Sequence, residues 1–401
     1  MRSTPRADSA ARQGLRLLRR GVAACLAVLT AMPVATAATP AVTQSEPLVV
    51  ASWGGAYETI QRRVFFEPFT RHTGIPVTAV EYAGGLAELR DQHASADVRW
   101  DVLDMTMSDT IAACAEGLLQ PLSPELPAAS PEGLSPQRDF IDGAFTECGI
   151  THTVYATVIA YDRRAFPGVR PDSVEALFDV ERFPGRRALQ RAPFGNLEWA
   201  LLSYGVPRVE LYDLLSTARG LRLAFERLAR IAGEAVWWRA GDVPPALLAA
   251  GEVAMATGYN GRFFHAIATE GAPIEIIWDG QIQEYETWAV ARGSSQPEAA
   301  RAFIRFATAT RRLAEFSRHI PYGPARRSAY RRVTTHPSTG IDMQPHLPTH
   351  PFNARNAVIK DVHWYARTYD RIRERFAAWY RSHHGEAPAA SPPRSGPSPQ
   401  L

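Results

Sequence analysis

Short apolar runs alternate with amphipathic stretches along most of the chain, and this pattern predicts strands followed by helices. In the first third the predicted strands are 48–52, 75–80 and 100–105. The predicted helices there are one through Phe65 and Phe69 that ends at Gly74, one over 86–93, and one from Ser108 or Asp109. This strand–helix–strand order is typical of a mostly parallel sheet with helical crossovers.

A long run of β-branched and aromatic residues, Thr151–Asp162, predicts a strand that could bridge two lobes. A second α/β region follows, with helices at 218–234 and 261–270 and strands at 253–259, 274–278 and 281–290. Ser295 and Glu298 form a capping box that opens a further helix. Two α/β lobes joined by strands place a cleft between them.

The first 37 residues have the three parts of a secretory signal peptide. Six Arg and one Asp precede a short apolar run, 21–33, and Ala35-Thr-Ala37 is a small-x-small cleavage pattern. The run is too short for a stable membrane anchor. Cys25 precedes most of the run, which argues against lipidation, and Arg19-Arg20 leaves twin-arginine export open beside the general route. We therefore expect a periplasmic protein cleaved near Ala37.

Cleavage changes the charge balance. The whole chain has 44 basic and 41 acidic residues, and the chain without residues 1–37 has 38 and 40. A nearly neutral protein gives no indication of nucleic-acid binding. Lysine occurs once, at Lys360, and all other bases are Arg, which we interpret as composition bias.

Cysteine and histidine predict a disulfide and no metal site or cofactor. Cys114 and Cys148 remain after cleavage, and an oxidising compartment favours a disulfide over two buried thiols. No Cys/His cluster has zinc spacing. The Pro-rich segment 385–401 predicts a disordered tail.

Paired carboxylates are the main candidate chemistry. Glu284 and Glu286 lie two residues apart in a predicted strand, so both side chains would project to the same face. Single aromatics stand beside Gly-rich turns elsewhere, at Trp53–Tyr57, Tyr82–Gly85, Tyr259–Gly261 and Tyr322. Carboxylates and aromatic faces together are suited to holding an organic cation.

Several segments together resemble the spermidine/putrescine-type periplasmic solute-binding proteins of ABC importers. They are Val49–Tyr57, Phe66–Phe69, Thr73–Ile75, Trp100–Asp104, Gly258–Gly261, Ile276–Gln281, Phe303–Phe306 and Ile320–Pro324. The resemblance covers about residues 47–385. It implies a type II-like α/β fold of two lobes, each with a mixed five-stranded sheet, joined by hinge strands. Lobe 1 would comprise 47–152 and 284–325, and lobe 2 would comprise 153–283 and 326–384.

The same resemblance implies a ligand site in the cleft. Trp53 and Tyr259 match aromatics that flank the ligand, and Glu286 and Glu198 match acids that take its ammonium groups. The remaining candidates are Tyr57, Asp104, Glu284 and Tyr322. Each has an alternative role: core packing for the aromatics, helix stabilisation for Glu198 and Asp104, solvent exposure for Glu284, and solvent exposure or a hinge ion pair for Glu286. The implied function is capture of putrescine, spermidine or a related amine by a monomer that docks on a membrane permease.

One departure leaves the ligand open. Met105–Ser108 stands where the family often has an aromatic, which favours a shorter diamine or another small cation. Other solutes, such as an amino acid derivative or ferric iron, are alternatives, although no Tyr-Tyr pair suits iron. A secreted hydrolase is the rival class; paired Glu could cut glycosides, but no Gly-x-Ser-x-Gly or His-Glu-x-x-His motif occurs.

Overall fold

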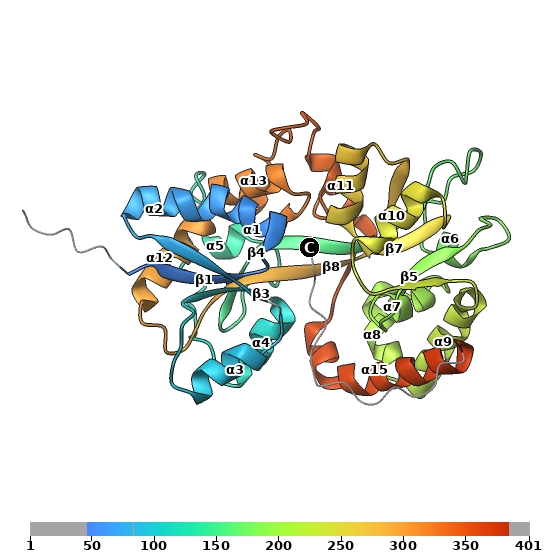
Figure 1. The fold of residues 1–401 in the computed structure, drawn as a ribbon, viewed down its shortest axis with the longest axis horizontal. Coiled ribbons are helices and arrows are strands. Elements are labelled where there is room, and N and C mark those ends of the chain that lie inside the picture. The colour runs from blue at the N-terminus through green and yellow to red at the C-terminus, as the bar shows by residue number, and fades with distance from the viewer. Residues whose placement is uncertain (1–45, 83, 385–401) are drawn as a thin grey trace, which may run out of the picture. The chain divides into compact units, whose positions relative to one another are not determined.

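The computed structural model describes residues 46–82 and 84–384. The predicted signal peptide and the predicted tail lie outside these residues. The strands are β1 (Leu48–Ser52), β2 (Val77–Glu81), β3 (Val102–Thr106), β4 (Gly149–Asp162), β5 (Arg187–Gln190), β6 (Val236–Trp238), β7 (Met255–Tyr259), β8 (Ile274–Val290), β9 (Gly323–Pro324) and β10 (Val358–Ile359). These strands form one sheet, and helices cover both of its faces (Figure 1).

The first third folds as the sequence predicts. β1 pairs in parallel with both β2 and β3. The connecting helices are α1 (Gly55–Gln61), a π-helical turn (Arg62–Phe66), α2 (Glu67–Thr73), α3 (Ala87–Ala94), α4 (Met107–Ala115) and the short α5 (Pro136–Asp139). Gly74 ends α2 with φ of 79°, a conformation that glycine adopts without steric cost. Thr106 caps α4 by accepting from the Asp109 N–H at 3.2 Å.

β4 and β8 are the strands that link the two halves of the fold. They pair antiparallel from Gly149↔Ala289 to Asp162↔Ile274. The strand order is β2-β1-β3-β8-β4-β7-β5-β6, so each half of the sheet has five strands only if β4 and β8 are counted in both. The expectation of two separate sheets is therefore wrong, because the shared strands make one continuous ladder.

An irregularity in this ladder interrupts β8. Thr157 pairs with Ile282, but Ile159 pairs with Ile277, so β8 carries extra residues between the two pairs. Gly280 lies in this bulge with φ of 64°. The sequence predicts two strands here, 274–278 and 281–290, and the bulge marks the break between them.

Helices of the second half cover β5, β6 and β7. They are α6 (Glu175–Phe178), α7 (Asn196–Leu202), a 3₁₀ turn (Arg208–Glu210), α8 (Leu211–Leu215), α9 (Ala218–Ala232), α10 (Val243–Ala250) and α11 (Asn260–Glu270). α9 buries Leu221, Leu228 and Ile231 on one face, as their spacing predicts.

The last segment returns to both halves. It comprises α12 (Pro297–Ala307), α13 (Thr310–His319), α14 (Arg327–Tyr330), 3₁₀ turns at Gln344–His346 and Asn353–Asn356, and α15 (Val362–His384). α12 begins at Pro297 with Gln296 as the N-cap and no side-chain cap, so the predicted Ser295–Glu298 capping box is wrong. Proline at N1 removes one of the N–H groups that a cap would satisfy.

The two largest groups of buried apolar residues form separate cores. The first includes Phe65, Trp288 and Phe303, and the second includes Trp199 and Leu228. The lobe boundaries remain a proposal, because the first core also contains six buried residues from the ranges assigned to lobe 2. They are Tyr155, Phe264, Ala329, Val333, Met343 and Leu347. In residues 46–82 and 84–384, no helix has the length and apolarity to cross a membrane.

Candidate ligand-binding site

Glu284 and Glu286 lie in the middle of β8, where the two halves of the sheet meet. Glu286 is opposite Thr106 of β3 and Thr153 of β4, and Glu284 is opposite Tyr155 of β4. Both side chains are buried, with 8% and 4% of their residues' surface exposed. Alternate strand residues share a face, so the structure brings these carboxylates together as predicted.

Glu286 has a buried carboxylate oxygen without a hydrogen-bond partner. Among the described residues, none bonds to its Oε2 atom. Burial raises the pKa of Glu286 well above its ordinary value, and the nearby carboxylates of Asp104 and Glu284 raise it further. The Trp53 indole acts in the opposite direction. An unpaired buried carboxylate is costly, so this atom requires a proton or a cationic partner.

Aromatic rings connect the two halves of the fold beside Glu286. Tyr57 of α1 lies 6.3 Å from Tyr322, ring centroid to ring centroid. Tyr322 lies 5.9 Å from Tyr155, which lies 6.3 Å from Tyr259 of β7. Burial raises the pKa of both Tyr57 and Tyr322, and the Glu286 charge adds to this effect. Trp53 belongs to the same region and packs 5.0 Å from Tyr82.

Asp104 lies behind this aromatic group. Its side chain is fully buried, and it accepts from Gln61 Nε2 at 2.5 Å and from His152 Nε2 at 2.9 Å. Gln61 in turn bonds to Ser52. These contacts use both carboxylate oxygens, so Asp104 supports the site through its charge on Tyr57 and Glu286.

Glu284 is paired with Lys360, a residue to which the sequence analysis assigned no role. The Lys360 Nζ atom donates to Glu284 Oε2 at 2.5 Å. The Lys360 ammonium also lies over two aromatic rings, 4.6 Å from the centroid of Phe194 and 5.2 Å from that of Tyr365. Backbone pairing fixes this position, because Lys360 follows β10 and its N–H donates to the Gln283 carbonyl at 3.0 Å.

Glu198 lies in the first turn of α7 and faces the same lysine. Its Oε2 accepts from the Gly195 N–H at 2.9 Å, and its Oε1 accepts from the hydroxyls of Tyr365 and Tyr212. Burial raises the pKa of Glu198 to about 7, although the hydrogen bonds and Lys360 lower it. The capping role that the sequence left as an alternative is present, with Gly195 as the N-cap.

The acidic neighbours of Lys360 stabilise its charged form. Burial lowers the pKa of Lys360, but Glu284, Glu198 and Asp109 together outweigh this effect and raise it. Its side chain is 16% exposed. A cavity of about 20 Å³ beside Glu284 and Lys360 is lined by residues of α4, β8 and the start of α15. This volume holds about one water molecule.

The first turn of α11 is the basic side of the site. A Cβ atom at Gly261 would lie 2.9 Å from Tyr322 Cε1 and 3.2 Å from its hydroxyl oxygen, so this turn touches Tyr322. The positive charge of Arg262 lowers the pKa of Tyr322, against the larger effects of burial and Glu286. Tyr322 therefore lies within reach of one negative and one positive charge.

The eight predicted site residues form two connected groups. Trp53, Tyr57, Asp104, Tyr322 and Glu286 form one, and Glu198 and Glu284 belong to the other around Lys360. Tyr259 stands between them, with its hydroxyl 3.5 Å from Gln190 Nε2. Tyr155, Lys360, Phe194 and Tyr365 also line these groups and were not predicted from the sequence. Only Lys360 carried a visible signal, as the one lysine of the chain.

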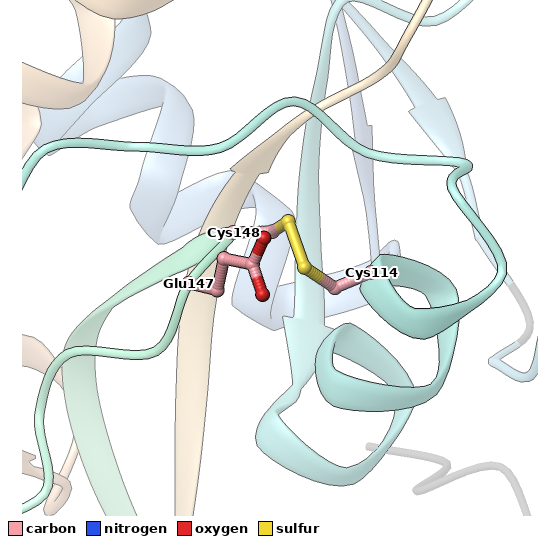
Figure 2. A group of neighbouring side chains, drawn as sticks. All are labelled: Cys114, Glu147 and Cys148. Carbon is pink, nitrogen blue, oxygen red and sulfur yellow. A yellow bond between two sulfur atoms is a disulfide. The ribbon is translucent and has the colours of Figure 1, made fainter.

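Cys114 and Cys148 form the predicted disulfide, with sulfur atoms 2.02 Å apart (Figure 2). Glu147 lies beside them, and these three side chains are the one group with metal-ligand spacing in the described part of the chain. Disulfide sulfurs are not the thiolates that bind metals, so the group does not fit a metal ion in this state.

A family model for bacterial extracellular solute-binding proteins matches residues 65–349. The γ-aminobutyric acid (GABA)-binding protein of Pseudomonas aeruginosa is 35% identical over 336 residues, which cover 84% of this chain and 91% of that protein.

The chain belongs to the bacterial extracellular solute-binding protein family. Members are the substrate-binding components of ABC transporters; they bind a small ligand outside the cytoplasm, work with a membrane permease and are not enzymes.

Solved structures support the same fold. A GABA receptor superposes with a TM-score of 0.70 at 26% identity, over 83% of this chain and 97% of that one. A spermidine/putrescine-binding protein from Streptococcus pneumoniae has a TM-score of 0.64 at 15% identity, over 84% of this chain and 100% of that one. The second likeness shows the fold alone. The two-lobed, type II-like α/β class predicted from the sequence is confirmed.

Proposed function

We propose that this protein captures an amino acid with its ammonium and carboxylate at opposite ends of a short chain, of the GABA type, for import by an ABC transporter. The observation that carries this proposal is the difference between the acids of the site. Glu286 has a buried, unpartnered oxygen, whereas Glu284 is paired with Lys360. The site thus offers one carboxylate to one ligand ammonium.

Glu286 would bind the ligand ammonium through a charge-assisted hydrogen bond. Trp53, Tyr57 and Tyr322 would cover the methylene groups and offer their faces to the cation. The raised pKa of Glu286 reflects the cost of ionising it in the absence of a cation, with burial as the main cause. A bound ammonium would lower this pKa and stabilise the ionised form.

The ligand carboxylate would lie at the first turn of α11. The N-terminus of an 11-residue helix favours an anion, and Arg262 lies in its first turn. The Glu286 charge raises the pKa of Tyr322 and the Arg262 charge lowers it, so both charges lie near this residue. A short zwitterion would match this arrangement at both ends.

A polyamine, the ligand predicted from the sequence, is the second candidate. Asp104 and Asp109 both raise the pKa of Glu286, so negative charge is abundant around this carboxylate. The 35% identity with a GABA-binding protein supports the first candidate over the second.

Titration calorimetry with four ligands of similar length tests the proposal: GABA, putrescine, butylamine and butyrate. We expect GABA to bind at least tenfold more tightly than putrescine, and more tightly than either singly charged compound. Tighter binding of putrescine would favour the polyamine candidate. Binding of butyrate with no preference for an ammonium would overturn the role of Glu286.

Two variants distinguish the role of Glu286 in ligand binding from the general effect of removing an acidic side chain. Glu286→Gln should lose GABA binding, and Glu275→Gln is the matched control. Glu275 lies on the same strand with its side chain 42% exposed, in a surface ion pair with Arg170. Such pairs contribute little, so this variant should bind as the wild type does.

A further inference from the structure

We infer that the Lys360 ammonium fills a second organic-cation subsite, built by Glu284, Glu198, Phe194 and Tyr365, and thereby makes the protein select ligands with a single ammonium. The selectivity claim rests on the proposed function at Glu286, but the occupied subsite does not. Lys360 is then a specificity-determining residue.

The surroundings of Lys360 are those of an amine-binding site. One carboxylate, Glu284, accepts a direct hydrogen bond at 2.5 Å. A second, Glu198, lies near enough to raise the lysine's pKa. Two aromatic faces lie 4.6 Å and 5.2 Å from the ammonium nitrogen. Carboxylates combined with aromatic faces recognise alkyl ammonium groups, and here the ammonium belongs to the chain itself.

The choice of lysine at this position requires a local cause. The chain has 44 basic residues, and Lys360 is the one lysine among them. Composition bias accounts for arginine elsewhere but not for its replacement at this site. An ammonium is compact and spherical, whereas a guanidinium is planar and needs a fork of acceptors. The space between Glu284 and the two rings suits the compact group.

The second subsite is aligned with the first. Glu284 and Glu286 are two residues apart on β8, which separates them by roughly 6.6 Å along the strand. This spacing is comparable with the length of a short diamine. Without the Lys360 ammonium, a diamine could place one nitrogen at each glutamate. With the ammonium present, the second nitrogen would meet a positive charge.

Thermal shift of Lys360→Ala with ethylammonium chloride tests the subsite without using GABA. Ethylammonium restores the ammonium and part of the stem that the substitution removes. We expect a saturable rise in melting temperature for this variant and not for the wild type. Tetramethylammonium chloride at equal concentration controls for ionic strength and lacks the N–H donors, so it should have less effect. Lys360→Arg, which keeps the charge, should not respond.

Selectivity is the second readout. We expect the ratio of putrescine to GABA affinity to rise at least tenfold in Lys360→Ala relative to the wild type, and to rise by less in Lys360→Arg, which keeps the positive charge. If Lys360→Ala does not fold in buffer, refolding in ethylammonium chloride should recover it. Failure of recovery overturns the subsite, as does an equal response to both ammonium salts.

The two proposals fail separately. If the wild type does not bind GABA but ethylammonium stabilises Lys360→Ala, the subsite stands and the ligand assignment falls. If the wild type prefers GABA and Lys360→Ala shows neither rescue nor a changed ratio, the subsite falls and the ligand assignment stands.

Discussion

Glu286 and Glu284 are neighbours on one face of β8, yet they have different partners. Glu286 lies beside the aromatic rings and has a buried oxygen with no hydrogen-bond partner among the described residues. Glu284 faces the second half and bonds to Lys360. Both glutamates are buried to a similar extent, so exposure does not distinguish them. What differs is whether the chain supplies the cation.

Because of this difference, the number of acidic residues in the site does not equal the number of ammonium groups that a ligand needs. Counting Glu198, Glu284 and Glu286 as free carboxylates predicts a ligand with two or more ammonium groups. The contacts leave one carboxylate for a ligand, because Lys360 takes Glu284, while Glu198 has a pKa of about 7 and three donors of its own. The number of carboxylates without a partner therefore favours a single ammonium.

The largest expected effect is on ligand binding at Glu286. Glu286→Gln should weaken GABA binding by about 2–5 kcal/mol, because the ligand ammonium would be buried without its partner. Glu284→Gln should weaken it by less, since Glu284 already has Lys360. Calorimetry on both variants measures the contrast. Equal losses would mean that both glutamates contact the ligand.

Removal of the disulfide should lower stability without changing this contrast. The bridge joins residues 34 positions apart. Replacing Cys114 and Cys148 by Ala should lower the free energy of unfolding by about 3–4 kcal/mol through the larger entropy of the unfolded chain. Denaturant unfolding measures the loss. GABA affinity within twofold of the wild type is expected; a larger change would tie the site to this bridge.

Protonation of Glu198 should make stability depend on pH. Burial raises its pKa in the folded protein from 4.5 to about 7, so the folded state retains a proton that the unfolded state releases. The free energy of unfolding should therefore fall by about 3 kcal/mol as pH rises from about 4.5 to about 7. Above that range this contribution is constant.

Glu198→Gln should remove that part of the pH dependence. Urea unfolding at about pH 5 and about pH 7.5 measures the difference between the two proteins. Glu210, an exposed acid in the second half of the fold, provides the matched control through Glu210→Gln. If stability instead rose with pH in the wild type and not in Glu198→Gln, then Glu198 would be bound as a carboxylate by its neighbours.

The smallest expected effect is the coupling between Lys360 and Glu284. Loss of either partner leaves a buried charge, but the lysine side chain is 16% exposed, which moderates the cost. A double-mutant cycle with Lys360→Met and Glu284→Gln should give a coupling of about 1–2 kcal/mol in unfolding free energy. Additive losses of unfolding free energy would show that the contact between Lys360 and Glu284 does not contribute to stability.

Local sequence patterns were sufficient for most of the fold. Runs of apolar, β-branched and aromatic residues located β1, β4 and the two parts of β8, and helical spacing located α9. The pattern did not show that β4 and β8 are shared by both halves, because strand sharing depends on pairing between residues over 100 positions apart. The start of α12 also differed by a residue or two, since proline at N1 took the place of a side-chain cap.

The candidate site shows the same difference between local patterns, which the sequence reveals, and long-range pairing, which it does not. The spacing of Glu284 and Glu286 predicted that their carboxylates lie together, because this follows from strand geometry alone. The pairing of Glu284 with Lys360 depends on β10, a two-residue strand that returns to β8 from 76 positions away. No local pattern marks such a contact. The single lysine was a signal, but composition bias offered a simpler interpretation.

A crystal structure of the wild type with bound GABA tests the central claim most directly. We predict that the ligand nitrogen lies about 2.7–2.9 Å from a carboxylate oxygen of Glu286 and that Lys360 remains bonded to Glu284. The ligand carboxylate should face the first turn of α11. A ligand nitrogen bound to Glu284 with Lys360 displaced, or a ligand carboxylate placed against Glu286, would contradict the account.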